Sequence, residues 1–203
     1  FVDLRFTDTR GKEQHVSVPA KVFDNDKFES GHAFDGSSIA GWKGIQASDM
    51  LLMPDPTTAN LDPFMDETTL LITCDVVEPG SREPYSRDPR YIARKAERYL
   101  TESGIATTSF WGPEVEFYIF DSLRFETSGH KSMYEIDSDE GIWNSGRNGT
   151  ANLAHRPRPK EGYFPVPPMD TLQDLRSQMV LALQASGIDV EVQHHEVGGP
   201  GQS

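Results

Sequence analysis

The 203-residue sequence predicts an α+β fold in which a sheet-rich N-terminal part precedes a part that mixes helices with strands. Three observations support this prediction. Alternating apolar residues dominate up to about residue 85, the polar stretch EPGSREPYSRDPR follows, and the first long helical pattern begins directly after it. We therefore expect two domains, residues 1–85 and 86–203.

Strand patterns account for most of the first domain. Val2, Leu4 and Phe6 alternate along FVDLRFTD, TRGK provides a turn, and QHVSVP resumes the alternation, which together predict a hairpin. Two further strands are predicted at 49–55 (DMLLMPD) and at 68–77.

Two helices are predicted in the second domain. Asp88 is a suitable N-cap and Pro89 a suitable first residue for a helix that runs from about 89 to 102. Asp170 and Gln173 have the spacing of a capping box at the start of the other helix. Its expected buried face consists of five apolar residues, Leu172, Leu175, Met179, Val180 and Leu183.

The remaining segments of the second domain are predicted to be extended. Residues 107–121 have a strand pattern, and the polar segment 122–168 is expected to be a long loop around a short hairpin. A Val-alternating strand is expected near residue 190, before a Gly-rich end. Asn148-Gly149-Thr150 matches a glycosylation sequon, which we treat as a chance match because no export signal is seen.

Composition excludes several classes of function. The formal net charge of −13 would repel a nucleic-acid backbone, so no nucleic-acid partner is expected. No apolar run is long enough to span a bilayer and the first residues lack the form of a secretory signal, so neither membrane nor export is expected. The single cysteine, Cys74, lies in an apolar run and is expected to be a buried inert thiol, which fits a reducing cytoplasm.

Two glutamates interrupt the strand pattern WGPEVEFYIFD. Glu114 and Glu116 would share one face of a strand about 7 Å apart, where two unit charges repel by roughly 2 to 3 kcal/mol at an effective dielectric near 20. Water offsets this repulsion if the face is exposed, and the segment by itself favours that reading. A divalent cation offsets it if the face lines a cavity.

Further acidic groups occur in DVEVQHHEV. Glu191 and Glu196 would face opposite sides of an ideal strand, so their joint use requires a bulge or a strand end between them. The adjacent His194 and His195 lack the spacing of a zinc site, and a satisfied structural histidine is the favoured reading. In FDGSSIAGWKG the P-loop spacing fails, and Asp35 by itself indicates an ordinary turn or cap.

Taken together, these segments resemble one family, the class I bacterial type of glutamine synthetase. The resembling segments are colinear and cover nearly the whole chain: FDGSSIAGWKGIQASDMLLMPDP, DPFMDETTLLITCDVVEPG, YSRDPRYIARKAERYL, WGPEVEFYIFD, KEGYFPVPPMD and HHEVGGPGQ. The resemblance implies a β-grasp-like N-terminal domain followed by the first part of an antiparallel-sheet α/β catalytic domain.

The resemblance also implies a reaction. Enzymes of this family phosphorylate the side-chain carboxylate of L-glutamate with ATP, and ammonia then displaces phosphate from the γ-glutamyl phosphate to give L-glutamine. Two Mg²⁺ or Mn²⁺ ions take part, which explains the need for carboxylate ligands. By motif, Glu116 and Glu196 would hold one metal, Glu114 would hold the other on the ATP phosphates, and Glu191 would contact the nucleotide.

Family members contribute a further loop to the neighbouring subunit's site, and Asp35 with Ser38 matches that loop. There the aspartate would help to bind ammonium and take its proton. The resemblance implies a cytoplasmic dodecamer of two stacked hexameric rings. Other family elements follow the GQ motif, so we expect this chain to be an N-terminal fragment that is inactive alone.

Two alternatives to ammonia ligation stay open. The first is a ligase that joins glutamate to another amine, since the metal and nucleotide groups would be shared. The second is a non-catalytic paralogue of the same fold, against which the joint retention of Glu114, Glu116, Glu191 and Glu196 argues.

Overall fold

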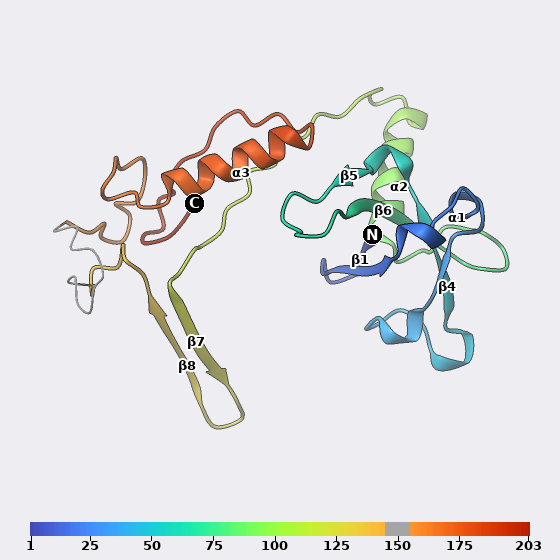
Figure 1. Ribbon diagram of the computed structural model, residues 1–203, viewed down its shortest axis with the longest axis horizontal. Helices are drawn as coiled ribbons and strands as arrows, with labels where there is room; N and C mark the ends of the chain where they lie inside the picture. Colours follow the sequence, from blue (N-terminus) through green and yellow to red (C-terminus); the bar gives the residue numbers. More distant parts are fainter. Residues whose placement is uncertain (145–154) are drawn as a thin grey trace. The chain divides into compact units, whose positions relative to one another are not determined.

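The computed structural model describes residues 1–144 and 155–203, and the glycosylation sequon lies outside them (Figure 1). By internal contacts the chain divides into two compact units, Phe1–Trp111 and Gly112–Ser203, and each is described by itself. The first long helix groups with the sheet in this division, and the predicted domain boundary near residue 85 stays a prediction.

The first unit contains a six-stranded mixed sheet with the strand order β2-β1-β6-β4-β3, in which β5 also pairs with β6. The strands are β1 Val2–Thr7, β2 Glu13–Val18, β3 His32–Asp35, β4 Asp49–Pro54, β5 Asn60–Leu61 and β6 Leu70–Val77. The pairing of β1 with β6 is parallel and the others are antiparallel. The predicted N-terminal hairpin and the two predicted later strands are confirmed.

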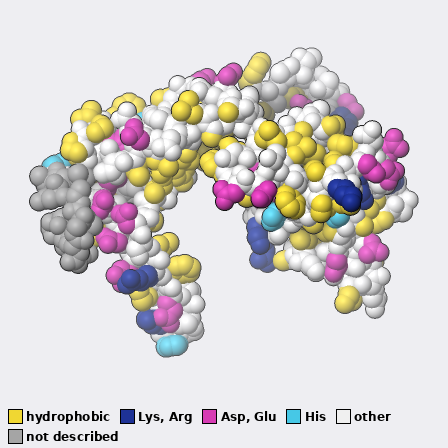
Figure 2. All heavy atoms as spheres, viewed as in Figure 1, with side chains coloured by type: hydrophobic (Ala, Val, Ile, Leu, Met, Phe, Trp, Pro, Cys, Tyr) yellow, Lys and Arg dark blue, Asp and Glu magenta, His cyan; other side chains and the backbone are white. Residues whose placement is uncertain are grey.

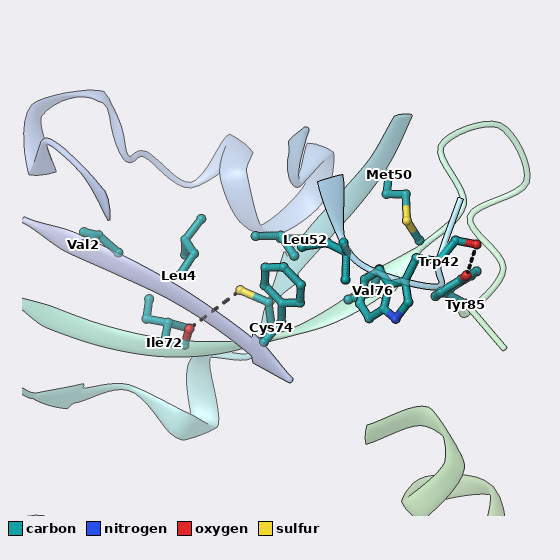
Figure 3. Close-up of a cluster of buried hydrophobic side chains, with 11 residues drawn as sticks. Val2, Leu4, Trp42, Met50, Leu52, Ile72, Cys74, Val76 and Tyr85 are labelled. Atoms are coloured by element: carbon teal, nitrogen blue, oxygen red, sulfur yellow. Dashed lines mark hydrogen bonds between the residues drawn. The ribbon is translucent and has the colours of Figure 1, made fainter. Parts of the chain in front are cut away.

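The core of the first unit lies on one face of this sheet. Alternate residues of β1, β4 and β6 are fully buried, including Leu4, Leu52 and Val76 (Figure 3). Cys74 is also completely buried, and burial, followed by the nearby Asp75 carboxylate, raises the pKa of its thiol to about 12. Such a thiol is protonated at neutral pH, as expected for an inert cysteine.

Short helices connect these strands, and one long helix follows them. They are the 3₁₀ helices η1 Ala20–Val22, η2 Gly36–Ser38, η3 Ile45–Ala47 and η4 Pro56–Thr58, and the α-helices α1 Asp26–Ser30 and α2 Pro89–Glu102. The bounds predicted for α2 are confirmed. Its N-cap Asp88 accepts hydrogen bonds from the Arg90 and Val76 backbone N–H groups, both at 3.0 Å, and so joins the helix start to β6.

The second unit contains the antiparallel hairpin of β7 Ser122–Thr127 and β8 Ser132–Asp137, and the helix α3 Gln173–Ala185. The short hairpin predicted within the polar segment 122–168 is confirmed. Within the part of the chain that the structure describes, no helix is both long and apolar enough to cross a bilayer.

The strand predicted at 107–121 was wrong for this structure. One isolated bridge forms, between Tyr118 and Gln202, and the segment also exchanges backbone hydrogen bonds with Gly201 and Ser203. The expected strand near residue 190 is likewise irregular. An alternating segment forms a strand only where a neighbouring strand provides hydrogen-bond partners along its length. Among the described residues, residues 201–203 provide such partners, and they pair only with 117–119 of the segment 107–121.

The start and the face of α3 also differ from prediction. Its N-cap is Leu172, which forms no capping box, because Asp170 instead accepts the Leu172 backbone N–H at 3.0 Å and pairs with Arg176. Arg176 is the buried residue of the helix, whereas Leu175 and Leu183 are each 40% exposed. Hydrophobic side chains accordingly reach the surface of the second unit (Figure 2).

Candidate functional site

The predicted ammonium loop lies in the first unit, where β3 ends and η2 begins. Asp35 is the N-cap of η2, and its Oδ1 accepts hydrogen bonds from the Ser37 backbone N–H at 2.8 Å and from the Ser37 hydroxyl at 2.6 Å. Its Oδ2 accepts a bond from the Ser38 hydroxyl at 3.2 Å. The structure therefore joins Asp35 and Ser38 in one exposed cap, which is the turn that the local sequence favours.

These bonds affect the charge of Asp35. The Ser37 hydroxyl, followed by the Ser37 N–H, lowers the pKa of the Asp35 carboxyl below its ordinary value. The group is thus ionised at neutral pH and presents a fixed negative charge to solvent. Such a carboxylate is well suited to binding a small cation, and it is a weak acceptor for a proton.

The four predicted glutamates lie in the second unit, on segments without regular structure. Glu114, Glu116 and Glu191 are exposed, and Glu196 is partly buried. Gln202 links two of them, because its Nε2 donates to Glu116 Oε2 at 3.0 Å and its backbone carbonyl accepts the Glu196 N–H at 3.0 Å. The structure thus brings Glu116 and Glu196 to one residue and leaves Glu114 and Glu191 outside this connection.

The donor set has the chemistry that a hard divalent cation requires, since carboxylate oxygens are the ligands that Mg²⁺ and Mn²⁺ prefer. Within residues 1–144 and 155–203, however, no three His, Cys, Asp or Glu side chains gather closely enough to hold a metal. Glu116 and Glu196 could therefore supply only part of the ligands of a metal ion, and further ligands are needed to complete its coordination shell.

A buried ion pair lies next to Glu196. His195 Nε2 is 2.7 Å from Glu140 Oε2, and both side chains are about 1% exposed. His195 Nδ1 faces two carbonyl oxygens, of Gly162 at 2.7 Å and of Glu196 at 3.0 Å, so this nitrogen must carry a proton. Since Nε2 faces a carboxylate, the imidazole carries both protons and is charged. The favoured reading of His195 as a structural histidine agrees with this geometry.

Glu140 is the centre of the buried network. Its Oε1 accepts from the Thr171 N–H at 2.8 Å and from the Thr171 hydroxyl at 2.9 Å, and its Oε2 also accepts from the Gly201 N–H at 2.7 Å. One carboxylate thereby connects the start of α3 with the segment that carries Glu196. Sequence reasoning missed Glu140, because nothing about an acid that follows Asp137 and Asp139 in a polar stretch signals burial.

Arg176 is the centre of a second buried hydrogen-bond network. Its guanidinium donates to Gln193 Oε1 at 2.7 Å and to the Ser203 hydroxyl at 3.0 Å, and it pairs with the Asp170 carboxylate. These hydrogen bonds hold both ends of the segment 193–203 against α3. Sequence reasoning missed Arg176 too, although an arginine at an apolar position of the helical pattern was a usable signal.

The Glu140 pair predicts a pH dependence. Burial opposes ionisation of Glu140, but the bonds from His195, Thr171 and Gly201 outweigh it and lower the pKa from 4.5 to about 2. Burial likewise opposes the charge on His195, but Glu140 raises the His195 pKa above 6.5. The Glu140 contribution is present above about pH 4.5 and is lost as the pH falls towards 2, and the His195 contribution is present below 6.5 and is lost at higher pH.

We therefore expect protection of the Gly201 amide against hydrogen exchange, corrected for intrinsic rates, to be highest between about pH 4.5 and 6.5. In Glu140→Gln the decline on the acid side should be much weaker, because the titrating group is absent. A wild-type protection factor that stays constant down to pH 2 would contradict the ion pair.

Two family models match the chain. One, described as the glutamine synthetase beta-grasp domain, matches residues 1–79, and the other, the glutamine synthetase catalytic domain, matches residues 86–203.

Curated relatives and a solved structure match the chain as well. The chain is 60% identical to a protein of Cupriavidus pinatubonensis named 3-hydroxylaminophenol mutase and 56% identical to a glutamine synthetase of Methylococcus capsulatus. All of this chain matches in both, and it spans 43% of the length of each relative. A solved glutamine synthetase of Plasmodium falciparum superposes with a TM-score of 0.83 at 25% identity, over 99% of this chain and 39% of that one.

Proposed function

The chain belongs to the glutamine synthetase family, and from this membership we propose that the full-length protein joins ammonia to the side-chain carboxylate of L-glutamate, using ATP and a γ-glutamyl phosphate intermediate. The observation that carries the proposal is the match of both family models, which together span almost all of the chain. The chain covers less than half of its relatives' length, so the proposal concerns the full-length protein.

In this proposal the glutamates hold two Mg²⁺ or Mn²⁺ ions. Glu116 and Glu196 bind one, Glu114 binds the other, and Glu191 contacts the nucleotide. When bound, such ions neutralise the negative charge of the phosphoryl group and of the substrate carboxylate. The link through Gln202 between Glu116 and Glu196 supports their joint use.

Asp35, with Ser38 beside it, binds the ammonium ion in the neighbouring subunit's site. An ionised carboxylate attracts the cation, and the lowered pKa of Asp35 supports this role more than that of a strong base. The full-length protein assembles as a cytoplasmic dodecamer of two hexameric rings, as family membership suggests. Such an arrangement is needed if the first unit of one subunit is to serve the second unit of another.

The experiment that tests the proposal replaces Glu116 by alanine in the full-length protein. We expect glutamine formation to fall by more than the roughly 10- to 100-fold loss typical when a residue behind a metal ligand is replaced, with weaker Mn²⁺ binding. The matched control is Glu126→Ala, because Glu126 lies on the exposed hairpin and pairs with Lys131. Unchanged turnover in Glu116→Ala would reject the role of this glutamate.

A second candidate activity follows from the Cupriavidus relative, whose name is that of a mutase and whose identity to this chain is as high as that of the synthetase. Assay of the full-length protein with 3-hydroxylaminophenol, without ATP or ammonia, separates the two. Parallel assays with other amines in place of ammonia test the alternative ligase. A protein inactive in every assay would indicate a non-catalytic paralogue.

A further inference from the structure

We propose that Gln202 is a positioning residue whose side-chain amide orients the Glu116 carboxylate so that one carboxylate oxygen stays free for a divalent cation. The inference rests on the proposed function, because it takes Glu116 as a metal ligand. Nothing in the sequence pattern singles out Gln202 for this role, and the hydrogen-bond geometry carries it.

The orientation of the amide is fixed by its two partners. Gln202 Oε1 accepts the Gly198 backbone N–H, so its nitrogen must be the atom that faces Glu116, at 3.0 Å from Oε2. Only one carboxylate oxygen is occupied, and Oε1 of Glu116 makes no hydrogen bond to the described residues. The hydrogen bond to Oε2 therefore fixes the orientation of the Glu116 carboxylate and leaves Oε1 available to a cation.

The backbone around Gln202 is also held in place. Its carbonyl accepts the Glu196 N–H at 3.0 Å, its N–H donates to Gly199 O at 3.3 Å, and the residue is only 8% exposed. Gly201, with a φ of +78°, lets the chain pass close to Ile119, since a Cβ there would overlap the Ile119 carbonyl oxygen. The amide is therefore presented to Glu116 from a constrained loop.

An amide suits this role for a chemical reason. Its N–H donor is neutral, so it holds Glu116 without cancelling the negative charge that attracts a cation, as a lysine or arginine would do. It also adds no carboxylate that would compete with Glu116 for the cation. Groups that hydrogen-bond a metal-binding carboxylate fix its direction, and their loss typically weakens metal affinity roughly 10- to 100-fold. Because the same residue receives the Glu196 N–H, it connects the two proposed ligands of one ion.

The test measures Mn²⁺ affinity of the full-length protein by electron paramagnetic resonance, without substrates. Gln202→Met keeps the length of the side chain and removes its donor, and we expect roughly 10- to 100-fold weaker Mn²⁺ binding. In a Glu116→Gln background the same substitution should cause no further loss, because the amide acts through the Glu116 carboxylate. Gln184→Met, the same change at an exposed site of α3, should leave affinity unchanged.

The outcomes separate the inference from the function on which it rests. Weakening by Glu116→Gln with no effect of Gln202→Met, or equal weakening by Gln202→Met in both backgrounds, would overturn the positioning role alone. Unchanged affinity in Glu116→Gln would reject Glu116 as a ligand and with it the proposal. If Gln202→Met fails to fold, Gln202→Asn serves instead, since its amide is one methylene too short to reach Glu116 and the same loss is expected.

Discussion

Glu140→Ala is expected to destabilise the second unit by about 3 to 5 kcal/mol. The substitution removes the carboxylate partner of the buried His195 imidazole and the acceptor for three further donors, from Thr171 and Gly201. A buried charge stripped of its partner costs much more than an exposed ion pair gains. We therefore expect the segment 195–203 to open locally before the rest of the unit unfolds.

Hydrogen exchange of the Thr171 and Gly201 amides in the full-length protein measures this effect, with protection expected to fall by a factor of 10² or more, which corresponds to about 3 kcal/mol. Glu140→Gln is the informative comparison, because it retains an oxygen for Thr171 and loses the charge. Glu135→Ala, an exposed acid on β8, is the control. Equal protection in Glu140→Ala and Glu135→Ala would contradict the network.

Much of the first unit could be predicted from the sequence because its rules are local. Alternation along β1 and β4 sets which apolar residues are buried, and the Asp88-Pro89 start sets the position of α2. The same reasoning failed for 107–121, where alternation was present without a neighbouring strand in the described residues. An alternating sequence pattern shows that a segment is able to form a strand. Whether the strand forms depends on partner residues that lie far away in the sequence.

The candidate site shows the same division. The predicted acids were recognisable as a group only through resemblance, since locally Glu114 and Glu116 indicated an exposed face, and they are exposed. Two residues organise the segment: Glu140 contacts His195, 55 positions away in the sequence, and Gln202 contacts Glu116, 86 positions away. No spacing rule reaches that far, so their roles emerge only from the fold.

Arg176→Met is expected to have an effect of similar size, about 3 to 5 kcal/mol, on the stability of the second unit. Methionine fills much of the volume of the arginine side chain and cannot pair with the buried Asp170 carboxylate. Gln193 and Ser203 would also lose their donor. The start of α3 and the segment 193–203 should therefore separate.

The measurement is urea-dependent hydrogen exchange of peptides that cover 170–177 and 193–203 in the full-length protein. Arg124→Met is the matched control, since Arg124 is exposed and lies 3.9 Å from Glu135 on the hairpin. Adding Asp170→Asn to Arg176→Met should restore part of the lost protection, because the buried carboxylate without a partner is removed. A double variant no more stable than Arg176→Met alone would mean that Arg176 acts mainly through Gln193 and Ser203, and the buried charge pair would not be the source of the stability.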